Sequence, residues 1–224
     1  MKHIFFSILF SIAVLCTTAQ RISKVTMAAA SILENMTIAT DDAVIIINQN
    51  GAILNYGVEY FSEKIPNYSR IENYAGRVEN YTTNDDKAYQ GKLKYLGRAA
   101  VTYYASYDVA SLQGKIKSIG NLVFTYYQDF EDESLKGKIK SIGTTTFNYY
   151  SSFENDVVKG KVKSIGNTSL DYYGGFENAA FKGKIKSIGQ ASFTYYSSFD
   201  KQFAGSMKTG NRVQNINGIT YLVN

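Results

Sequence analysis

Lysine and tyrosine recur at fixed spacing along the second half of this chain, and they are its main candidates for chemistry. The heptapeptide GKIKSIG begins at Gly114, Gly137 and Gly183, with GKVKSIG at Gly160 and GKLKYLG at Gly91. A pair of adjacent tyrosines follows each copy. Ammonium groups interleaved with aromatic rings can bind anionic polymers, because the lysines neutralise charge while the rings stack.

The copies begin 23 residues apart without any insertion. If each unit adds two strands to one sheet, equivalent residues lie roughly 10 Å apart and form columns. The candidate ligand-binding residues form three such columns: Lys92, Lys115, Lys138, Lys161 and Lys184; Lys94, Lys117, Lys140, Lys163 and Lys186; and Tyr104, Tyr127, Tyr150, Tyr173 and Tyr196. The columns also have a purely structural explanation, which is favoured, because exposed lysines keep a sheet soluble and prevent edge pairing.

Several classes of catalytic chemistry are excluded by composition. The chain contains one histidine, His3, and one cysteine, Cys16, and both lie in a segment that looks like a secretory signal peptide, residues 1–19. That segment has a basic start, a mainly apolar run and the small residues Thr17 and Ala19 before the cleavage point. The mature chain would therefore have no Ser–His–Asp triad, thiolate nucleophile or zinc site.

Carboxylates are the remaining catalytic option. They fall in the turns between units and vary from copy to copy, as in EDES, ENDV and ENAA. Paired carboxylates need a defined separation in a cleft, so these residues are interpreted as solvated turn residues. No phosphate-binding loop or calcium loop motif is present in the sequence, and we expect no cofactor and no metal.

Each unit is interpreted as a β-hairpin, because KIKSI alternates, Gly-Asn favours a turn and VFTYYQDF is rich in strand formers. A three-residue loop that pairs Ile119 with Val123 keeps the faces separate. In that register the buried face carries Ile116, Phe124, Tyr126 and Phe130, and the outer face carries Lys115, Lys117, Thr125, Tyr127 and Asp129.

The predicted organisation has five parts: a signal peptide (1–19), an N-terminal segment that forms a short helix or a strand (20–42), divergent hairpins (43–90), five repeats (91–205) and a capping hairpin (206–224). Asn50-Gly51 and Asn217-Gly218 are turn signals in the flanking hairpins. About sixteen strands exceed what an open twisted sheet usually holds. We therefore expect an all-β antiparallel meander that closes as a barrel or folds over on itself.

Two resemblances support this interpretation. The signal ending in TTAQ and the GKIKSIG…YY…F unit resemble exported repeat proteins of Bacteroidota. The fourth unit is also loosely similar to MORN repeats at Tyr172, Gly174, Phe176 and Gly183, but Ala179 and Ile185 stand where that pattern has glycine. The second resemblance implies stacked hairpins with a role in scaffolding or lipid contact.

The net charge of +5 is only mildly basic and the chain carries a predicted export signal, so nucleic acid is not expected as a partner. The apolar content suits a folded core. We expect an exported, non-enzymatic β-repeat protein with a structural or interaction role at the cell envelope, located in the periplasm, on the outer surface or outside the cell. The alternatives are a binding module for an anionic polysaccharide or lipid headgroup through the lysine–tyrosine face, and a carboxylate-based hydrolase. An envelope protein is a third kind of partner. After cleavage of the signal no transmembrane segment is expected.

Overall fold

The computed structural model describes residues 20–28, 31–62 and 69–224, in which strands form nearly all of the regular structure. They belong to a seven-stranded, an eleven-stranded and a two-stranded sheet. The prediction of an all-β fold built from tandem hairpins is confirmed. The expected signal peptide, with His3 and Cys16, lies outside the described residues.

The repeats form the eleven-stranded sheet, here called the repeat sheet, in which each unit contributes two neighbouring antiparallel strands. The strand order runs from β16 through to β6 without a crossover. Its strands are β6 (Val78–Asn80), β7 (Leu93–Leu96), β8 (Ala99–Tyr103), β9 (Ile116–Ile119), β10 (Leu122–Tyr126), β11 (Ile139–Ile142), β12 (Thr145–Tyr149), β13 (Val162–Ile165), β14 (Thr168–Tyr172), β15 (Ile185–Ile188) and β16 (Ala191–Ser192).

The two strands within each unit are joined by a two-residue turn, so the predicted three-residue loop is wrong. Ile119 pairs with Leu122, not with Val123, around Gly120 and Asn121. Gly120 has a φ of 53°, as a tight hairpin turn requires at this position. Because the loop is one residue shorter than expected, the strand pairing must contain another irregularity that keeps the apolar residues on one face.

That irregularity is a β-bulge in the first strand of each unit. Phe124 of β10 pairs with Ile142 of β11, whereas Tyr126 pairs with Ile139, three residues earlier in β11. One extra residue, in the region of Lys140, is thereby accommodated, and both isoleucines face the core although they are three positions apart. The same shift recurs at the other junctions between units.

The seven-stranded sheet joins the two ends of the described chain and is here called the covering sheet. Its order is β19-β20-β1-β2-β3-β4-β5, and all pairs are antiparallel except β1 with β20. Its strands are β1 (Arg21–Met27), β2 (Leu33–Ala39), β3 (Val44–Ile47), β4 (Ile53–Phe61), β5 (Ser69–Glu72), β19 (Val213–Ile216) and β20 (Ile219–Val223). The hairpin turns predicted at Asn50-Gly51 and Asn217-Gly218 are confirmed by the pairing of β3 with β4 and of β19 with β20.

The short helix considered for residues 20–42 is wrong, and its strand alternative holds in the described part of that segment. β1 and β2 pair there along nearly their whole length. β2 also pairs with β3 from Met36 to Ala39, so its backbone hydrogen bonds go to two neighbouring strands and not along a helix. The apolar residues of this segment pack against the apolar face of the repeat sheet and remove it from water.

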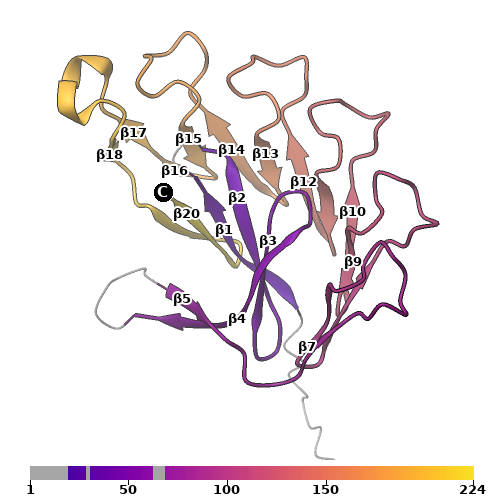
Figure 1. Cartoon of the computed structure of the whole chain (residues 1–224). Coiled ribbons are helices and arrows are strands. Elements are labelled where there is room, and N and C mark those ends of the chain that lie inside the picture. Colours follow the sequence, from indigo (N-terminus) through magenta and orange to yellow (C-terminus); the bar gives the residue numbers. More distant parts are fainter. Residues whose placement is uncertain (1–19, 29–30, 63–68) are drawn as a thin grey trace, which may run out of the picture.

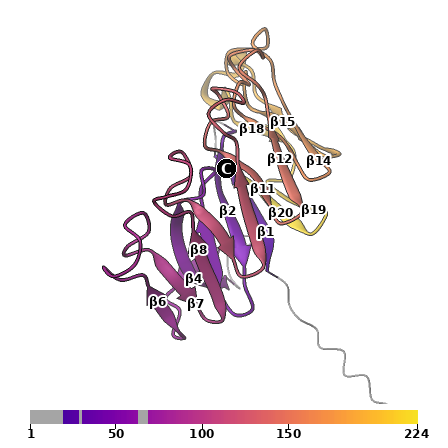
Figure 2. The same cartoon turned by 90° about the vertical axis from the view of Figure 1, so that its right-hand side faces the viewer.

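One continuous hydrophobic core joins the two large sheets. Phe124 and Phe147 of the repeats are fully buried, as are Met36 and Ile45 of the covering sheet. Figure 1 shows the repeats side by side in a curved row, with β1–β3 on the inner side of the curve and the long loops along one outer edge. Figure 2 shows the same arrangement from the side. Of the two predicted closures, the fold therefore corresponds to a curved sheet with a second sheet folded over it.

The last repeat ends in the two-stranded sheet, formed by β17 (Thr194–Tyr195) and β18 (Met207–Thr209). Between them lies a short 3-10 helix, η1 (Ser198–Phe203). Ser197 caps this helix, and the side chain of Asp200 bonds back to the backbone of Ser197. The loop of the last unit is therefore fixed by local hydrogen bonds.

Candidate functional site

The second lysine of each unit projects from the outer face of the repeat sheet, as predicted from the sequence. Lys117 is exposed, and its Nζ lies 5.5 Å from the centre of the Tyr104 ring, which belongs to the preceding unit. The same cation–π contact is made by Lys94, Lys140, Lys163, Lys186 and Lys208. Lys140 also forms an ion pair with Glu131 at 2.6 Å. These lysines therefore connect neighbouring units while their ammonium groups reach solvent.

The first lysine of each unit is placed differently from the prediction, which put it on the outer face. Lys115 precedes β9, is half-buried and donates from Nζ to the carbonyl oxygen of Gly137 at 2.9 Å. Its Nζ lies 5.0 Å from the centre of the Tyr126 ring. Equivalent contacts to a glycine carbonyl and a tyrosine ring are made by Lys92, Lys138, Lys161 and Lys184. The outward orientation is wrong because the carbonyl of the next unit attracts the ammonium group.

Burial affects the titration of this first lysine column. It lowers the pKa of Lys115, Lys138 and Lys161, because a charged ammonium group loses hydration when it is partly covered. Lys92, at the start of the array, is more exposed than the others. The column is therefore most accessible to solvent at its first member, Lys92.

The two tyrosines of each pair join neighbouring units. Tyr126 is buried and donates to the carbonyl oxygen of Ile116 in its own unit at 2.8 Å. Tyr127 is half-buried and donates to the carbonyl oxygen of Phe147 in the next unit at 2.9 Å. Rings of successive units also meet edge to face, as in Tyr127 with Tyr149. The lysine–tyrosine columns thus form a ladder that holds the repeats in register, and a ligand role for them stays a prediction.

The turn carboxylates close the loops, as their turn positions suggested. Glu131 accepts from the backbone N–H of Gln128 at 2.7 Å, and Asp108 accepts in the same way from Ala105 at 2.6 Å. The hydrogen bond with Lys140 lowers the pKa of Glu131, and the backbone bond from Gln128 lowers it further. Across the residues that the structure describes, no group of three His, Cys, Asp or Glu side chains could hold a metal ion.

A second acidic position links one loop to the next. Asp132 accepts from the backbone N–H and the hydroxyl of Ser152 in the following loop, both at 3.0 Å. Hydrogen bonds from Ser134 and Ser152 lower its pKa to about 2. Asp86 bonds to Ser106 in the same way, so several of the loops are held at a fixed spacing by side-chain bonds.

The tips of these loops carry a row of exposed aromatic side chains that the sequence analysis missed. The residues are equivalent, one per unit, and are here called the loop-tip row: Tyr107, Phe130, Phe153, Phe176 and Phe199. Their exposed fractions lie between 86% and 103%. The loops of the first four members are two strands apart in the repeat sheet, which corresponds to roughly 10 Å at the level of the sheet, and Phe199 follows in the loop between β17 and β18.

Phe130 was predicted to lie in the core, and this placement is wrong. The strand β10 ends at Tyr126, and the backbone of Tyr127 then pairs with Lys138 and Gly137 to close the loop. Phe130 therefore lies outside the sheet. The signal in the sequence is the residue pair that precedes the aromatic, Ser-Ser in two units and Gly-Gly in another, since such pairs interrupt a strand.

The loop-tip row is set in an acidic surrounding. The five loops (105–113, 128–136, 151–159, 174–182 and 197–204) contain nine acidic residues and four lysines, a net charge of −5, whereas the whole chain has a net charge of +5. The row places five exposed aromatic side chains at equivalent positions, and concentrated exposed apolar surface marks interaction sites. The row is the strongest candidate for a contact surface in the described structure.

Comparison with known families gives one match. A profile of the BspA type leucine-rich repeat region matches residues 88–211 in six copies, which is more than half of the chain. No curated protein and no solved structure matches the chain. No helix within the described residues is long and apolar enough to span a membrane.

Proposed function

Because the chain belongs to the BspA-type leucine-rich repeat family, we propose that it is a non-enzymatic module that binds a protein partner through the loop-tip row. Repeats of this family are generally surface, adhesion or interaction modules, and the proteins that carry them are commonly exported or surface-located. The proposal places the protein at the cell envelope, after removal of the segment that resembles a signal peptide.

The observation that carries the proposal is the exposure of the loop-tip row. Phe153 and Phe176 have no covering side chain, although phenylalanine gains roughly 1.5–3 kcal/mol from burial. The loops beneath them are held by hydrogen bonds such as Asp132 to Ser152, so the rings are presented on a fixed frame. A frame that is already ordered reduces the entropy lost on binding.

The chemistry of the loops indicates the kind of surface that would fit. An apolar patch flanked by lysine or arginine would cover the rings and pair with the surrounding carboxylates. A negatively charged membrane would be repelled by the same carboxylates. A protein surface is therefore the partner that the charge pattern favours.

Site-specific photocrosslinking tests the proposal. A benzoylphenylalanine at position 153 in the producing cell should form an adduct with one polypeptide, and substituting Phe130 and Phe176 by serine should abolish the adduct. The same probe at Val123, which is exposed on the outer sheet face, is the matched control. Equal adducts at both positions, or none at position 153, would contradict the proposal.

A second candidate function uses the outer lysines. Lys117 and Lys186 are exposed, and among the described residues neither forms an ion pair. A regular column of such cations fits an anionic polymer, such as an acidic polysaccharide. Retention on immobilised polygalacturonate should fall steeply between low and moderate salt, and further when both lysines are changed to glutamine. Retention that is unchanged by salt would exclude this function.

A further inference from the structure

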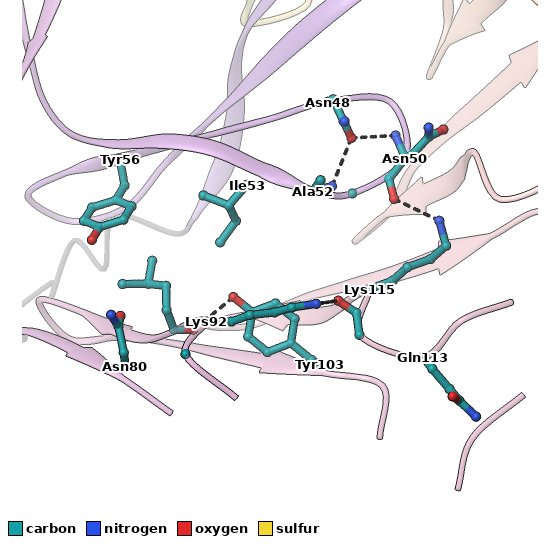
Figure 3. A pocket seen from close by; sticks show the side chains of 14 residues that line it. Asn48, Asn50, Ala52, Ile53, Tyr56, Asn80, Lys92, Tyr103, Gln113 and Lys115 are labelled. Carbon is teal, nitrogen blue, oxygen red and sulfur yellow. Dashed lines mark hydrogen bonds between the residues drawn. The ribbon is translucent and has the colours of Figure 1, made fainter. Parts of the chain in front are cut away.

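A cavity lies where the tip of the β3–β4 hairpin meets the start of the repeat sheet. Its volume is about 610 Å³, and it is lined by residues of that tip, such as Asn48, Asn50 and Ile53, and of the first units, such as Lys92, Tyr103 and Lys115 (Figure 3). This size falls within the range of small-molecule sites. The cavity is separate from the loop-tip row and shares none of its residues.

The hairpin tip is anchored, so the cavity has a fixed wall. The backbone N–H of Ile139 donates to the carbonyl oxygen of Gln49 at 2.8 Å. Lys115 Nζ donates to the carbonyl oxygen of Asn50 at 3.1 Å. Gly51 lies so close to the Tyr126 ring that an added Cβ would approach the hydroxyl oxygen to 2.2 Å. The contact between Lys115 and Asn50 joins two segments that are 65 residues apart in the sequence.

The charges of the lining are all of one sign. Lys92 and Lys115 are its only charged residues, and neither forms an ion pair with any described residue. An ammonium group has three N–H donors. Lys115 uses two of them, on Gly137 and Asn50, and Lys92 uses one, on Gly114. Three N–H donors of the two ammonium groups therefore have no hydrogen-bond acceptor among the described residues.

The rest of the lining offers groups that suit a hydroxylated ring. The partly exposed ring of Tyr56 and side chain of Ile53 provide apolar surface, and the buried ring of Tyr103 lies behind Lys92. The side-chain amide nitrogen of Asn48 stays available, because only its oxygen is used, by the N–H groups of Asn50 and Ala52. The mixture of aromatic surface, amides and cations matches a sugar that carries an acid group.

We propose that this cavity binds an acidic sugar, whose carboxylate accepts hydrogen bonds from Lys92 and Lys115 and whose ring lies against Tyr56 and Ile53. No other lysine of the first column offers the same environment. Lys138 has the same glycine and tyrosine contacts, but it does not line the cavity and experiences the charge of Asp132. Lys138 is therefore a matched control for the lysine–tyrosine ladder itself.

Isothermal titration calorimetry of the purified full chain tests the proposal with three probes at low salt: digalacturonate, its neutral counterpart digalactose, and galactose 6-phosphate. Digalacturonate should bind saturably and digalactose should not. Lys92→Gln and Lys115→Gln should each weaken binding roughly tenfold or more, since each removes a charged hydrogen bond. Lys115→Arg should keep most of the affinity, and Lys138→Gln should change it by less than about twofold.

Several results would overturn the proposal. Equal binding of digalactose would show that the carboxylate is not recognised, and binding of the phosphate sugar alone would assign a different acid group. A loss in Lys138→Gln as large as in Lys115→Gln would place the ligand on the lysine ladder, and a loss in Lys117→Gln would place it on the outer face. Absence of digalacturonate binding while circular dichroism shows a native fold would also reject it. None of these outcomes depends on the loop-tip row.

Discussion

Four buried tyrosines of the repeat sheet should make the fold sensitive to alkali. Tyr103, Tyr126, Tyr149 and Tyr172 are only 3–8% exposed, and each donates its hydroxyl to a backbone carbonyl. Burial raises the pKa of all four above the usual value of 10, because a phenolate would lose its hydration. Raising the pH from 8 to 11 should therefore lower the free energy of unfolding.

The magnitude follows from the difference between the two states. Below pH 10 the tyrosines are protonated in the folded and the unfolded chain, and stability is unaffected. Above it the unfolded chain ionises first, so each buried tyrosine removes about 1.4 kcal/mol per pH unit. Four of them remove about 5–6 kcal/mol at pH 11, which is comparable to the whole stability of many domains.

The half-buried lysines act in the opposite direction and reduce this loss. The pKa of Lys115 is lowered by burial in the folded chain, so at pH 8 its charge disfavours folding. That unfavourable contribution disappears as the pH rises through the folded pKa toward the unfolded value. The net loss at pH 11 should therefore be somewhat smaller than the contribution of the tyrosines alone.

Urea unfolding followed by circular dichroism at pH 8, 9, 10 and 11 measures the effect. Tyr149→Phe should reduce the dependence on pH by at most about a quarter, since it removes one of these four groups while Tyr195 and Tyr221, whose pKa burial also raises, still contribute. Tyr107→Phe should leave it unchanged, because that ring is exposed. Ionisation of every tyrosine near pH 10 with a native circular dichroism spectrum would refute the reasoning, as would equal slopes in both variants.

Three further predictions concern the loops and glycines. Phe153→Ser should change the free energy of unfolding by less than about 0.5 kcal/mol, whereas Phe147→Ala should cost about 3–5 kcal/mol in urea titrations, because only the second ring is buried. Gly114→Ala should lower the melting temperature more than Gly91→Ala. Both have positive φ, but an added Cβ would lie 2.5 Å from a backbone oxygen only at Gly114. Asp132→Ala should speed amide hydrogen exchange in its own and the next loop, while Asp132→Asn should have a smaller effect, since asparagine occupies the equivalent place in two other units.

The hairpins could be predicted because their signals are local. Alternating KIKSI strands, the glycines between them and the Asn217-Gly218 turn each report on a few neighbouring residues. The role of the second lysine as an outward group also followed from alternation. The register could not be predicted in this way, because the bulge near Lys140 depends on pairing with the preceding unit. A strict two-residue period therefore led to a loop one residue too long.

The candidate contact surface shows the same limit. Phe130 continued an apparent strand pattern and was assigned to the core, although the chain leaves the sheet after Tyr126. Whether an aromatic residue is buried depends on where the pairing of its β-strand ends. The backbone hydrogen bonds of Tyr127 with Gly137 and Lys138 set that end. The first lysine column was misplaced for a related reason, since its partner carbonyl belongs to the next unit.

The sequence by itself determined the repeat, the β-hairpin unit and the absence of histidine and cysteine from the chain after residue 19. These are properties of residue types and of neighbours along the chain. The tertiary structure alone decided that strands from both ends of the described chain cover the repeats, and that Asn50 comes to lie against Lys115. Such contacts arise because the apolar face of a long sheet must be buried by some other part of the molecule, and local periodicity does not specify which part that is.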